Sequence, residues 1–267
     1  KRVAEEAGVS IKTVSRIVNG DAAVNAKTRA AVQKHLKHLN YVPNQAARQM
    51  RSGESSVIGL MTDVITTTPY SVDIVRGAQS ALKDSHGTLL IASTEGDPEL
   101  EKELWRMFRA HRVAGVAYAA MYHRKHNLDS AHAHSVVLAN CFSSDSTLPS
   151  IVPDDEQGGY LQARYLLERG HRNIGIITLV PDLVATSLRD KGMRRAFAEA
   201  GVSFDLNKLK RGMSGEIGRE ISVTHEVARD LLEHANRPTA IICGNDQVAM
   251  RVFAVAASLG LSVPQDL

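Results

Sequence analysis

The pattern of apolar and polar positions changes once along the chain, near residues 43–56. Before that point, apolar residues recur at helical spacing in short segments with no strand pattern between them. This spacing predicts three helices: Lys1–Ala7, Ser10–Val18 and Asn25–Leu39. Ser10 and Asn25 stand where their side-chain oxygens can cap the helices that follow. Residues 1–42 therefore predict a small helical domain.

From Val57 onward, apolar runs of five to seven residues alternate with amphipathic stretches, which is typical of βαβ units. The runs predict six strands: Val57–Thr62, Thr88–Ser93, Val113–Ala119, Ser135–Asn140, Asn173–Thr178 and Thr239–Cys243. We expect a helix after each strand, so that helices cover both faces of a parallel sheet. The pattern predicts a doubly wound α/β body over 57–267, with lobes of about 57–150 and about 151–267, joined to the helical domain through a connector over 43–56.

The second predicted helix has one apolar face and one polar face. Its apolar face is formed by Val14, Ile17 and Val18, which we expect to pack against Val3, Ala4 and Ala7. Its polar face carries Lys12, Ser15, Arg16 and Asn19. A short helix with donors on one face fits the DNA major groove, where Lys12 and Arg16 can donate to guanine and Ile11 can contact a thymine methyl. The alternative is a surface helix with ordinary charges.

Charge is divided unevenly between the two parts. Residues 1–56 hold ten Lys and Arg against four Asp and Glu, a net charge of +6, whereas the rest holds 22 against 25, a net charge of −3. A basic domain on a mildly acidic body is typical of a protein that meets phosphate at one end only.

The chain has no apolar run long enough to span a membrane and no secretion signal at its start, so we expect a cytoplasmic protein with no membrane partner. Both cysteines, Cys141 and Cys243, lie in apolar runs and are interpreted as buried small hydrophobic residues. Four histidines have spacings that admit a metal, but no full ligand set converges on them, and a polar surface helix and loop is the favoured interpretation. These are His123, His126, His132 and His134.

Three stretches of the helical domain carry a family resemblance: Val3-Ala4-Glu5-Glu6-Ala7-Gly8-Val9-Ser10, Thr13-Val14-Ser15-Arg16 and Val18-Asn19-Gly20. Together they strongly resemble the DNA-binding head of the lactose-repressor (LacI/GalR) family. The resemblance implies that Ile11, Lys12 and Arg16 read bases. It also implies that Ser10, Thr13, Ser15 and Asn19 hold phosphates or the helix itself.

The connector resembles the hinge of the same family through Asn40-Tyr41-Val42-Pro43-Asn44 and Ala46-Ala47-Arg48-Gln49-Met50. Met50 falls where the family commonly has a leucine that wedges into the minor groove, and Ala47 lies one helical turn before it. The alternative for Met50 is a core methionine of the connector. A helix over Asn44–Arg51 is too short to be stable alone, so we expect it to order only when paired on DNA. This predicts a homodimer on a pseudo-palindromic operator.

The body resembles the same family more loosely, through Asp155-Glu156-Gln157-Gly158-Gly159-Tyr160 and Leu166-Leu167-Glu168-Arg169-Gly170-His171-Arg172-Asn173-Ile174. The resemblance implies a fold similar to periplasmic sugar-binding proteins, with a ligand between two lobes. Ligands of open α/β sheets bind at the carboxyl ends of strands. The candidates at such ends are Asp63, Tyr70, Arg189, Asn245 and Asp246.

The resemblance matches Arg189 to the arginine that grips ligand hydroxyls, and Asn245 with Asp246 to an Asn-Asp pair. A guanidinium, an amide and a carboxylate together suit a sugar or another polyol. The alternatives are a helix cap for Asn245 or Asp246 and a surface position for Arg189. Departures from the family are the region Phe204–Thr224, where Gly212-Met213-Ser214-Gly215 replaces a common aromatic residue, and an apparent truncation after Leu267.

The sequence thus predicts a DNA-binding transcriptional regulator, a repressor, whose operator affinity is controlled by a small polar effector, a sugar. No cofactor, metal or catalytic residue is assigned. A small-molecule enzyme is the first alternative, but the chain shows no Gly-rich phosphate loop and no nucleophile elbow. A solute-binding receptor without DNA activity is the second, and the basic head argues against it.

Overall fold

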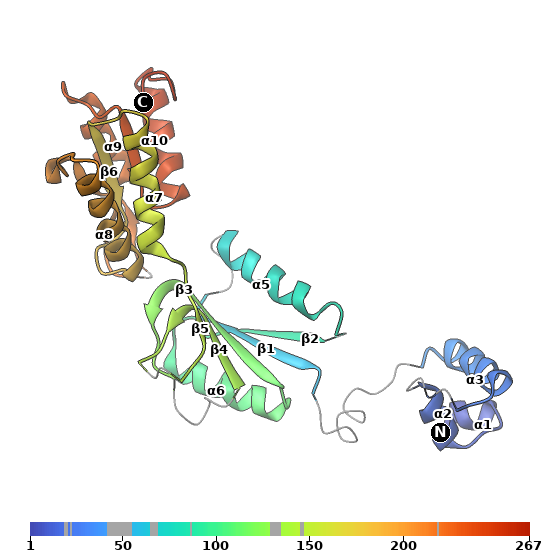
Figure 1. The fold of residues 1–267 in the computed structure, drawn as a ribbon. Helices are drawn as coiled ribbons and strands as arrows, with labels where there is room; N and C mark the ends of the chain where they lie inside the picture. Colours follow the sequence, from blue (N-terminus) through green and yellow to red (C-terminus); the bar gives the residue numbers. More distant parts are fainter. Residues whose placement is uncertain are drawn as a thin grey trace. The chain divides into compact units, whose positions relative to one another are not determined.

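The computed structural model describes residues 1–18, 21, 23–41, 55–64, 69–85, 87–128, 135–144, 147–217 and 219–267, without the side chains of residues 69 and 70. These residues form two compact units, Lys1–Ser56 and Val57–Leu267. Figure 1 shows the helical first unit and the α/β second unit. Each unit is described by itself.

The first unit contains three helices, α1 (Arg2–Glu6), α2 (Ile11–Val18) and α3 (Ala26–His38). They pack around a small core in which Val32 of α3 is fully buried. The other buried members are Val3, Ala4, Val14 and Ile17, and Ala7 and Val18 pack against them, as the apolar face of α2 predicts. Both predicted caps are present: Ser10 Oγ accepts from the Thr13 amide at 3.1 Å, and Asn25 Oδ1 accepts from the Lys27 amide at 2.8 Å.

The first lobe of the second unit is built on a parallel sheet in the order β2-β1-β3-β4-β5. Its strands are β1 (Val57–Thr62), β2 (Thr88–Ser93), β3 (Gly115–Lys125), β4 (Val136–Phe142) and β5 (Ser150–Ile151). Helices α5 (Pro69–Leu82) and α6 (Pro98–Ala110) lie on opposite faces of this sheet (Figure 1). Phe108 of α6 packs on Tyr118 and Leu138 of the sheet in one buried cluster.

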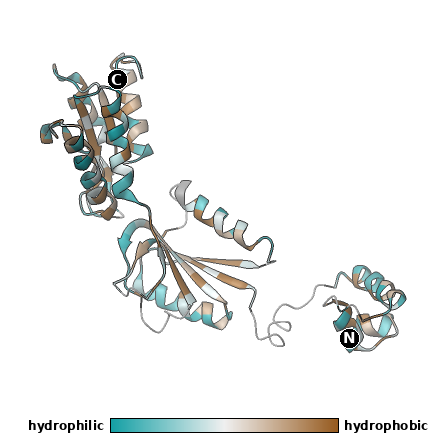
Figure 2. Ribbon diagram, viewed as in Figure 1, coloured by the Kyte–Doolittle hydropathy of each residue, from teal (hydrophilic) through white to brown (hydrophobic). Residues whose placement is uncertain are grey.

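The second lobe has a parallel sheet in the order β10-β6-β7, made of β6 (Ile174–Thr178), β7 (Leu209–Arg211) and β10 (Ala240–Cys243). On one face, α7 (Asp155–Glu168) and α8 (Val184–Glu199) share a core with Ile176. On the other face, α9 (Thr224–Glu233) and α10 (Asp246–Ser258) share a core with Ile177. The strands are mostly hydrophobic, as expected for strands covered on both faces (Figure 2).

Helices α7 and α8 approach each other unusually closely because glycines stand at their crossing. A Cβ atom on Gly159 of α7 would lie 2.1 Å from the carbonyl oxygen of Arg189, and one on Gly192 of α8 would lie 1.9 Å from the carbonyl oxygen of Glu156. No side chain larger than hydrogen fits at either position without moving a backbone. This close approach brings Arg189 next to the start of α7.

The predicted fold class is confirmed, whereas several predicted elements differ from the structure. Strand β3 ends at Lys125 rather than at residue 119, so residues 120–125, where a helical segment was expected to begin, are strand instead. Three short strands and a 3₁₀ turn in the second lobe were not predicted. The strands are β7, β8 (Met213–Ser214) and β9 (Ile221–Ser222), and the 3₁₀ turn is η2 (Leu206–Lys208). Strands β8 and β9 pair with each other.

The interpretation of His123 and His126 as part of a polar surface helix and loop was also wrong. His123 lies inside β3 with a side chain only 6% exposed, and His126 follows the strand with a side chain 11% exposed. The polar residues Tyr122-His123-Arg124-Lys125 do not show a strand pattern in the sequence, because the side chains and strand that they contact come from distant segments. The other two histidines of that group, His132 and His134, lie outside the described residues.

Candidate functional site

Helix α2 presents its polar face away from the core of the first unit. Ser10, Ile11, Lys12 and Arg16 are exposed, with Ile11 at 56%, while Thr13 and Ser15 are half-buried. Ile11 is an apolar side chain that the fold leaves accessible, so it is available for a contact with another molecule. The structure therefore keeps the predicted reading residues on one accessible face of α2.

Arg16 is held in place by Asp21 in this structure. Its Nε donates to Asp21 Oδ2 at 2.7 Å, while Asp21 Oδ1 accepts from the Ala23 amide at 3.0 Å. The hydrogen bond from Arg16 is the largest of the effects that hold the pKa of Asp21 below its usual value. Asp21 was not singled out from the sequence. It fixes the direction of the Arg16 guanidinium before any ligand arrives.

The remaining predicted DNA contacts cannot be followed in the structure. Asn19, Ala47 and Met50 lie outside the described residues, as does the predicted hinge segment Asn44–Arg51. Of the predicted effector residues, Tyr70 lies in the first turn of α5, and its side chain is outside the described part of the chain.

Asp63 stands directly after β1 and is nearly buried, with 6% of its surface exposed. Its Oδ1 accepts from the amides of Met121 at 2.8 Å and Val64 at 3.0 Å, and its Oδ2 accepts from Arg124 Nη2 at 3.2 Å. This carboxylate joins the ends of β1 and β3. The more exposed member of the pair is Arg124, whose side chain is 37% exposed and which the sequence analysis did not select.

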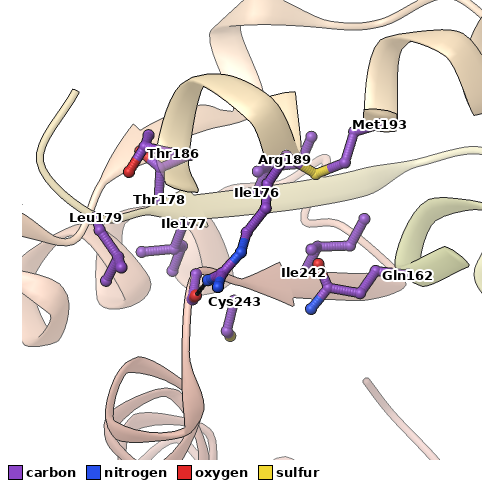
Figure 3. A pocket seen from close by; sticks show the side chains of 11 residues that line it. Gln162, Ile176, Ile177, Thr178, Leu179, Thr186, Arg189, Met193, Ile242 and Cys243 are labelled. Carbon is purple, nitrogen blue, oxygen red and sulfur yellow. Dashed lines mark hydrogen bonds between the residues drawn. The ribbon is translucent and has the colours of Figure 1, made fainter. Parts of the chain in front are cut away.

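In the second lobe, a small pocket lies at the carboxyl ends of β6 and β10. Its lining comes from the ends of these two strands, from Gln162 of α7, and from Thr186, Arg189 and Met193 of α8. Figure 3 shows the Arg189 side chain extending across the pocket toward the backbone beside Cys243. There the Arg189 Nη1 donates to the carbonyl oxygen of Gly244. Burial raises the pKa of the Cys243 thiol to about 11, so this wall of the pocket is neutral.

Arg189 is tied to a buried carboxylate that sequence reasoning missed. Its Nε donates to Asp155 Oδ1 at 2.8 Å, and its Nη2 lies 2.7 Å from the same oxygen. The second oxygen of Asp155 lies 2.7 Å from His123 Nδ1 of the first lobe. Asp155 was noted only as part of a family stretch. The available signal was an acidic residue at a helix start, which is common at capped helices and not specific.

Asn245 and Asp246 stand at the beginning of α10, next to the pocket backbone of Gly244. Asn245 caps the helix, since its Oδ1 accepts from the Val248 amide at 2.9 Å. Asp246 is the first residue of the helix and is exposed. The cap alternative for Asn245 is thus realised, and the cap employs only its carbonyl oxygen.

A second contact also joins the two lobes. Tyr122 of β3 donates its hydroxyl to Glu220 Oε2 at 3.3 Å, and Glu220 lies just before β9. Burial, followed by the charge of Glu220, raises the pKa of Tyr122 above its usual value. The Tyr122 hydroxyl therefore stays protonated as a donor at neutral pH.

Among the described residues, no group of three or more His, Cys, Asp or Glu side chains is arranged to hold a metal ion. In the same part of the chain, no helix is both long and apolar enough to cross a membrane. What the site residues offer is hydrogen-bond donors and acceptors for a polar ligand.

A helix-turn-helix head with exposed donors, followed by a two-lobed α/β body in which Arg189 lines a pocket at the strand ends, defines a ligand-responsive DNA-binding regulator. Two family comparisons agree with this class. Residues 1–44 match the family described as bacterial regulatory proteins, lacI family. Residues 55–267 match the periplasmic binding proteins and sugar binding domain of LacI family.

The chain belongs to the LacI family of bacterial regulators. It is a DNA-binding transcriptional regulator whose operator binding is controlled by an effector. Its similar curated relatives include the sucrose operon repressor of Shigella flexneri, 31% identical over all of this chain and 81% of the relative. Another is the transcriptional repressor PurR of Yersinia pestis, 30% identical over all of this chain and 78% of the relative.

Solved structures give the same assignment. A LacI-family regulator from Rhizobium etli is 43% identical, with a TM-score of 0.72 over 80% of this chain and 77% of that one. The Lac repressor dimer bound to operator and the anti-inducer ONPF is 26% identical, with a TM-score of 0.75 over 99% of this chain and 78% of that one.

Proposed function

We propose that α2 is the helix that reads operator DNA, with Ile11, Lys12 and Arg16 on base edges. Ser10, Thr13, Ser15 and Asn19 would contact phosphates or support the helix. The exposed polar face of α2, opposite a face buried in the core, is the observation that carries this proposal. The net charge of +6 over residues 1–56 supports it by supplying an attraction to phosphate.

The test of the DNA proposal is a titration of the operator duplex and of a scrambled duplex by fluorescence anisotropy over a salt series. Arg16→Ala is expected to lose about 1–3 kcal/mol of binding to the operator only, because it removes a base contact. Lys34→Ala is the matched control, since it removes one exposed positive charge from α3. Equal losses for both duplexes in Arg16→Ala would refute a reading role for this residue.

We infer further that the effector is a sugar, bound by Arg189 with Asn245 and Asp246. The observation that carries this inference is the position of Arg189, whose guanidinium spans a pocket at the strand ends. The description of the matching family and the name of the sucrose operon repressor support a sugar. Asp63 and Tyr70 remain proposed contacts from the first lobe, and the contacts of Asp63 support an indirect role, through Arg124.

The effector is tested by thermal denaturation of the purified protein against a panel of neutral sugars, purines and sugar phosphates. A true effector raises the melting temperature in proportion to the logarithm of its concentration, because it binds only the folded body. Arg189→Lys is expected to abolish that stabilisation. Arg194→Lys is the matched control on the same helix, since it pairs with Asp190 on the surface. Stabilisation that survives in Arg189→Lys would remove this residue from the site.

We propose that the active form is a homodimer, with the outer face of α10 at the interface. Met250 is 69% exposed and Phe253 is 52% exposed, which places two large apolar side chains on one helix surface. Met250→Asp is expected to give monomers that keep their helical content, measured by sedimentation velocity and circular dichroism. Leu206→Asp is the control, because Leu206 is 61% exposed on η2, beside β7 at the opposite sheet edge from β10. Dimers that persist in Met250→Asp would exclude this interface.

The proposed division of the chain is a DNA-binding domain over 1–42, a hinge over 43–56 and an effector domain over 57–267 with a lobe boundary near residue 150. The division into compact units at residue 56 supports it. On the sequence resemblance alone, Ala47 and Met50 contact the minor groove of a pseudo-palindromic operator. We propose no catalytic activity, because the sucrose operon repressor and PurR, to which the chain is similar, are transcriptional repressors.

A further inference from the structure

The carboxylate of Asp155 lies at a junction of three elements. Asp155 is the first residue of α7, and its side chain is only 2% exposed. Oδ2 contacts His123 Nδ1 of β3 at 2.7 Å, while Oδ1 contacts Arg189 Nε of α8 at 2.8 Å and Nη2 at 2.7 Å. Both oxygens are therefore occupied by partners from separate elements.

The position of the Asp155 carboxylate is fixed by the residues and helices around it. The ring of His123 packs edge-on against Phe142, with centroids 5.7 Å apart, so its direction is set by β4. Asp155 is the first residue of α7, and the N-terminus of a helix favours a nearby negative charge. The glycines at the α7–α8 crossing, Gly159 and Gly192, set how far Arg189 lies from Asp155.

The consequence for Arg189 is electrostatic. A guanidinium has five N–H donors, and here three of them reach Asp155 and the Gly244 carbonyl. Its side chain is 30% exposed, so the group lies between a buried negative charge and the pocket. The pair as a whole carries no net charge. An incoming anion would have to compete with Asp155 for the same cation, whereas a hydroxyl group needs only a donor.

The same arrangement recurs at the strand ends of the first lobe. Arg124 lies 3.2 Å from Asp63, whose other oxygen is bound by two backbone amides. Arg124 and Arg189 are therefore each paired with a nearly buried carboxylate, Asp63 and Asp155 respectively, whose negative charge offsets the positive charge of the arginine.

We propose that Asp155 is the positioning residue and counter-charge of Arg189, held by His123, and that it makes the site select uncharged, hydroxyl-bearing effectors over anionic ones. This inference rests on the proposed function in one respect, namely that Arg189 contacts the effector.

The test measures binding of inorganic phosphate by calorimetry at constant ionic strength. Asp155→Asn keeps the shape of the side chain and removes its charge, so phosphate affinity is expected to rise at least tenfold. The gain should vanish in the double variant Asp155→Asn/Arg189→Gln. Asp154→Asn is the matched control, because the neighbouring Asp154 is an exposed helix cap and asparagine also caps well. Equal phosphate affinity in wild type and Asp155→Asn, or a gain that survives the loss of Arg189, would overturn the proposal.

A second measurement needs no variant at Asp155, in case Asp155→Asn does not fold. The Nε–H signal of Arg189 in a ¹H–¹⁵N spectrum, assigned by its absence in Arg189→Lys, is expected to exchange slowly with water in the ligand-free protein. It should exchange at least tenfold faster in His123→Gln, which releases Oδ2 of Asp155. Exchange as fast as that of surface arginines in the wild type would overturn the proposal.

These results separate the inference from the proposed function. A phosphate gain through Arg189 with no stabilisation by any sugar would keep the charge rule and reject the sugar. Stabilisation by a sugar through Arg189, with no gain in phosphate affinity in Asp155→Asn, would keep the sugar as effector and reject the charge rule.

Discussion

Adjacent glycines in α7 offer a direct test of how the effector site is built. Gly158 and Gly159 occupy neighbouring helical positions, but a Cβ atom on Gly158 would meet no atom within 4 Å, whereas one on Gly159 would lie 2.1 Å from the Arg189 carbonyl oxygen. Alanine at position 158 should stabilise the protein by up to about 1 kcal/mol, through the better helix propensity of alanine. Alanine at position 159 gains the same propensity and must also displace α8.

The size of that displacement follows from the contact distance. Real Cβ atoms essentially never approach another atom closer than 3.0 Å, so α8 must retreat by about 0.9 Å, the difference from 2.1 Å. Overpacking of a tight contact costs about 1–3 kcal/mol. The two variants should therefore differ in unfolding free energy by about 1–3 kcal/mol, because both gain the helix propensity of alanine and only Gly159→Ala bears the cost of overpacking.

The assay is urea unfolding followed by circular dichroism, together with hydrogen exchange of α7 and α8 by mass spectrometry. Gly159→Ala is expected to unfold at lower urea and to weaken effector binding, because the shift moves Arg189 away from Asp155. Gly158→Ala should retain effector binding. If both variants have the same stability within about 0.5 kcal/mol, the close approach of α7 and α8 does not hold the site together.

Three further predictions follow from the charges and thiols. Because the pKa of Asp21 is lowered, its pairing with Arg16 should be intact above the usual Asp pKa and should be lost as the pH falls through the lowered value. The Arg16 Nε–H signal followed by NMR below pH 4 checks this, and a titration midpoint at the usual Asp pKa would contradict it. Burial raises the pKa of Cys141 and Cys243 to about 11, so iodoacetamide at pH 8 should label them slowly in the native protein and quickly in urea, which mass spectrometry can count. Operator affinity should fall steeply with salt concentration, and Lys12→Ala should weaken binding to the operator more than to a scrambled duplex, because Lys12 is proposed to read base edges; equal losses for the two duplexes in an anisotropy titration would contradict that role.

The first unit could be predicted from the sequence because its determinants are local. The faces of α2 follow from the spacing of Val14 and Ile17, and the caps Ser10 and Asn25 act within three residues. Strands β1 and β2 also have their predicted bounds, since an unbroken apolar run between helical stretches leaves few other choices. The family resemblance added Arg189 as a candidate, and the structure places it in a pocket.

The parts that sequence reasoning missed depend on contacts between distant segments. The end of β3 is strand because it pairs with β4, with Arg124 beside Cys141 and Lys125 beside Phe142. Asp63, 58 residues away in the chain, accepts from the Met121 amide of the same segment. The polar residues at the end of β3 show no alternation of apolar and polar positions that would indicate a strand. Asp63 was selected as a ligand for its position, and only the fold shows that its oxygens are already engaged.

The amino-acid sequence by itself determined the fold class and the helical head with its basic charge, because periodicity, caps and composition act locally or are summed over the chain. The family followed from the resemblance of short motifs in the head and the connector. Tertiary structure alone decided the electrostatics of the site. Asp155 and His123 are 32 residues apart, and Asp155 and Arg189 are 34 residues apart, so no local pattern relates them. They meet because Gly159 and Gly192 let two helices touch and because the end of β3 points at the start of α7. A buried carboxylate needs such partners, and only packing can bring them to it.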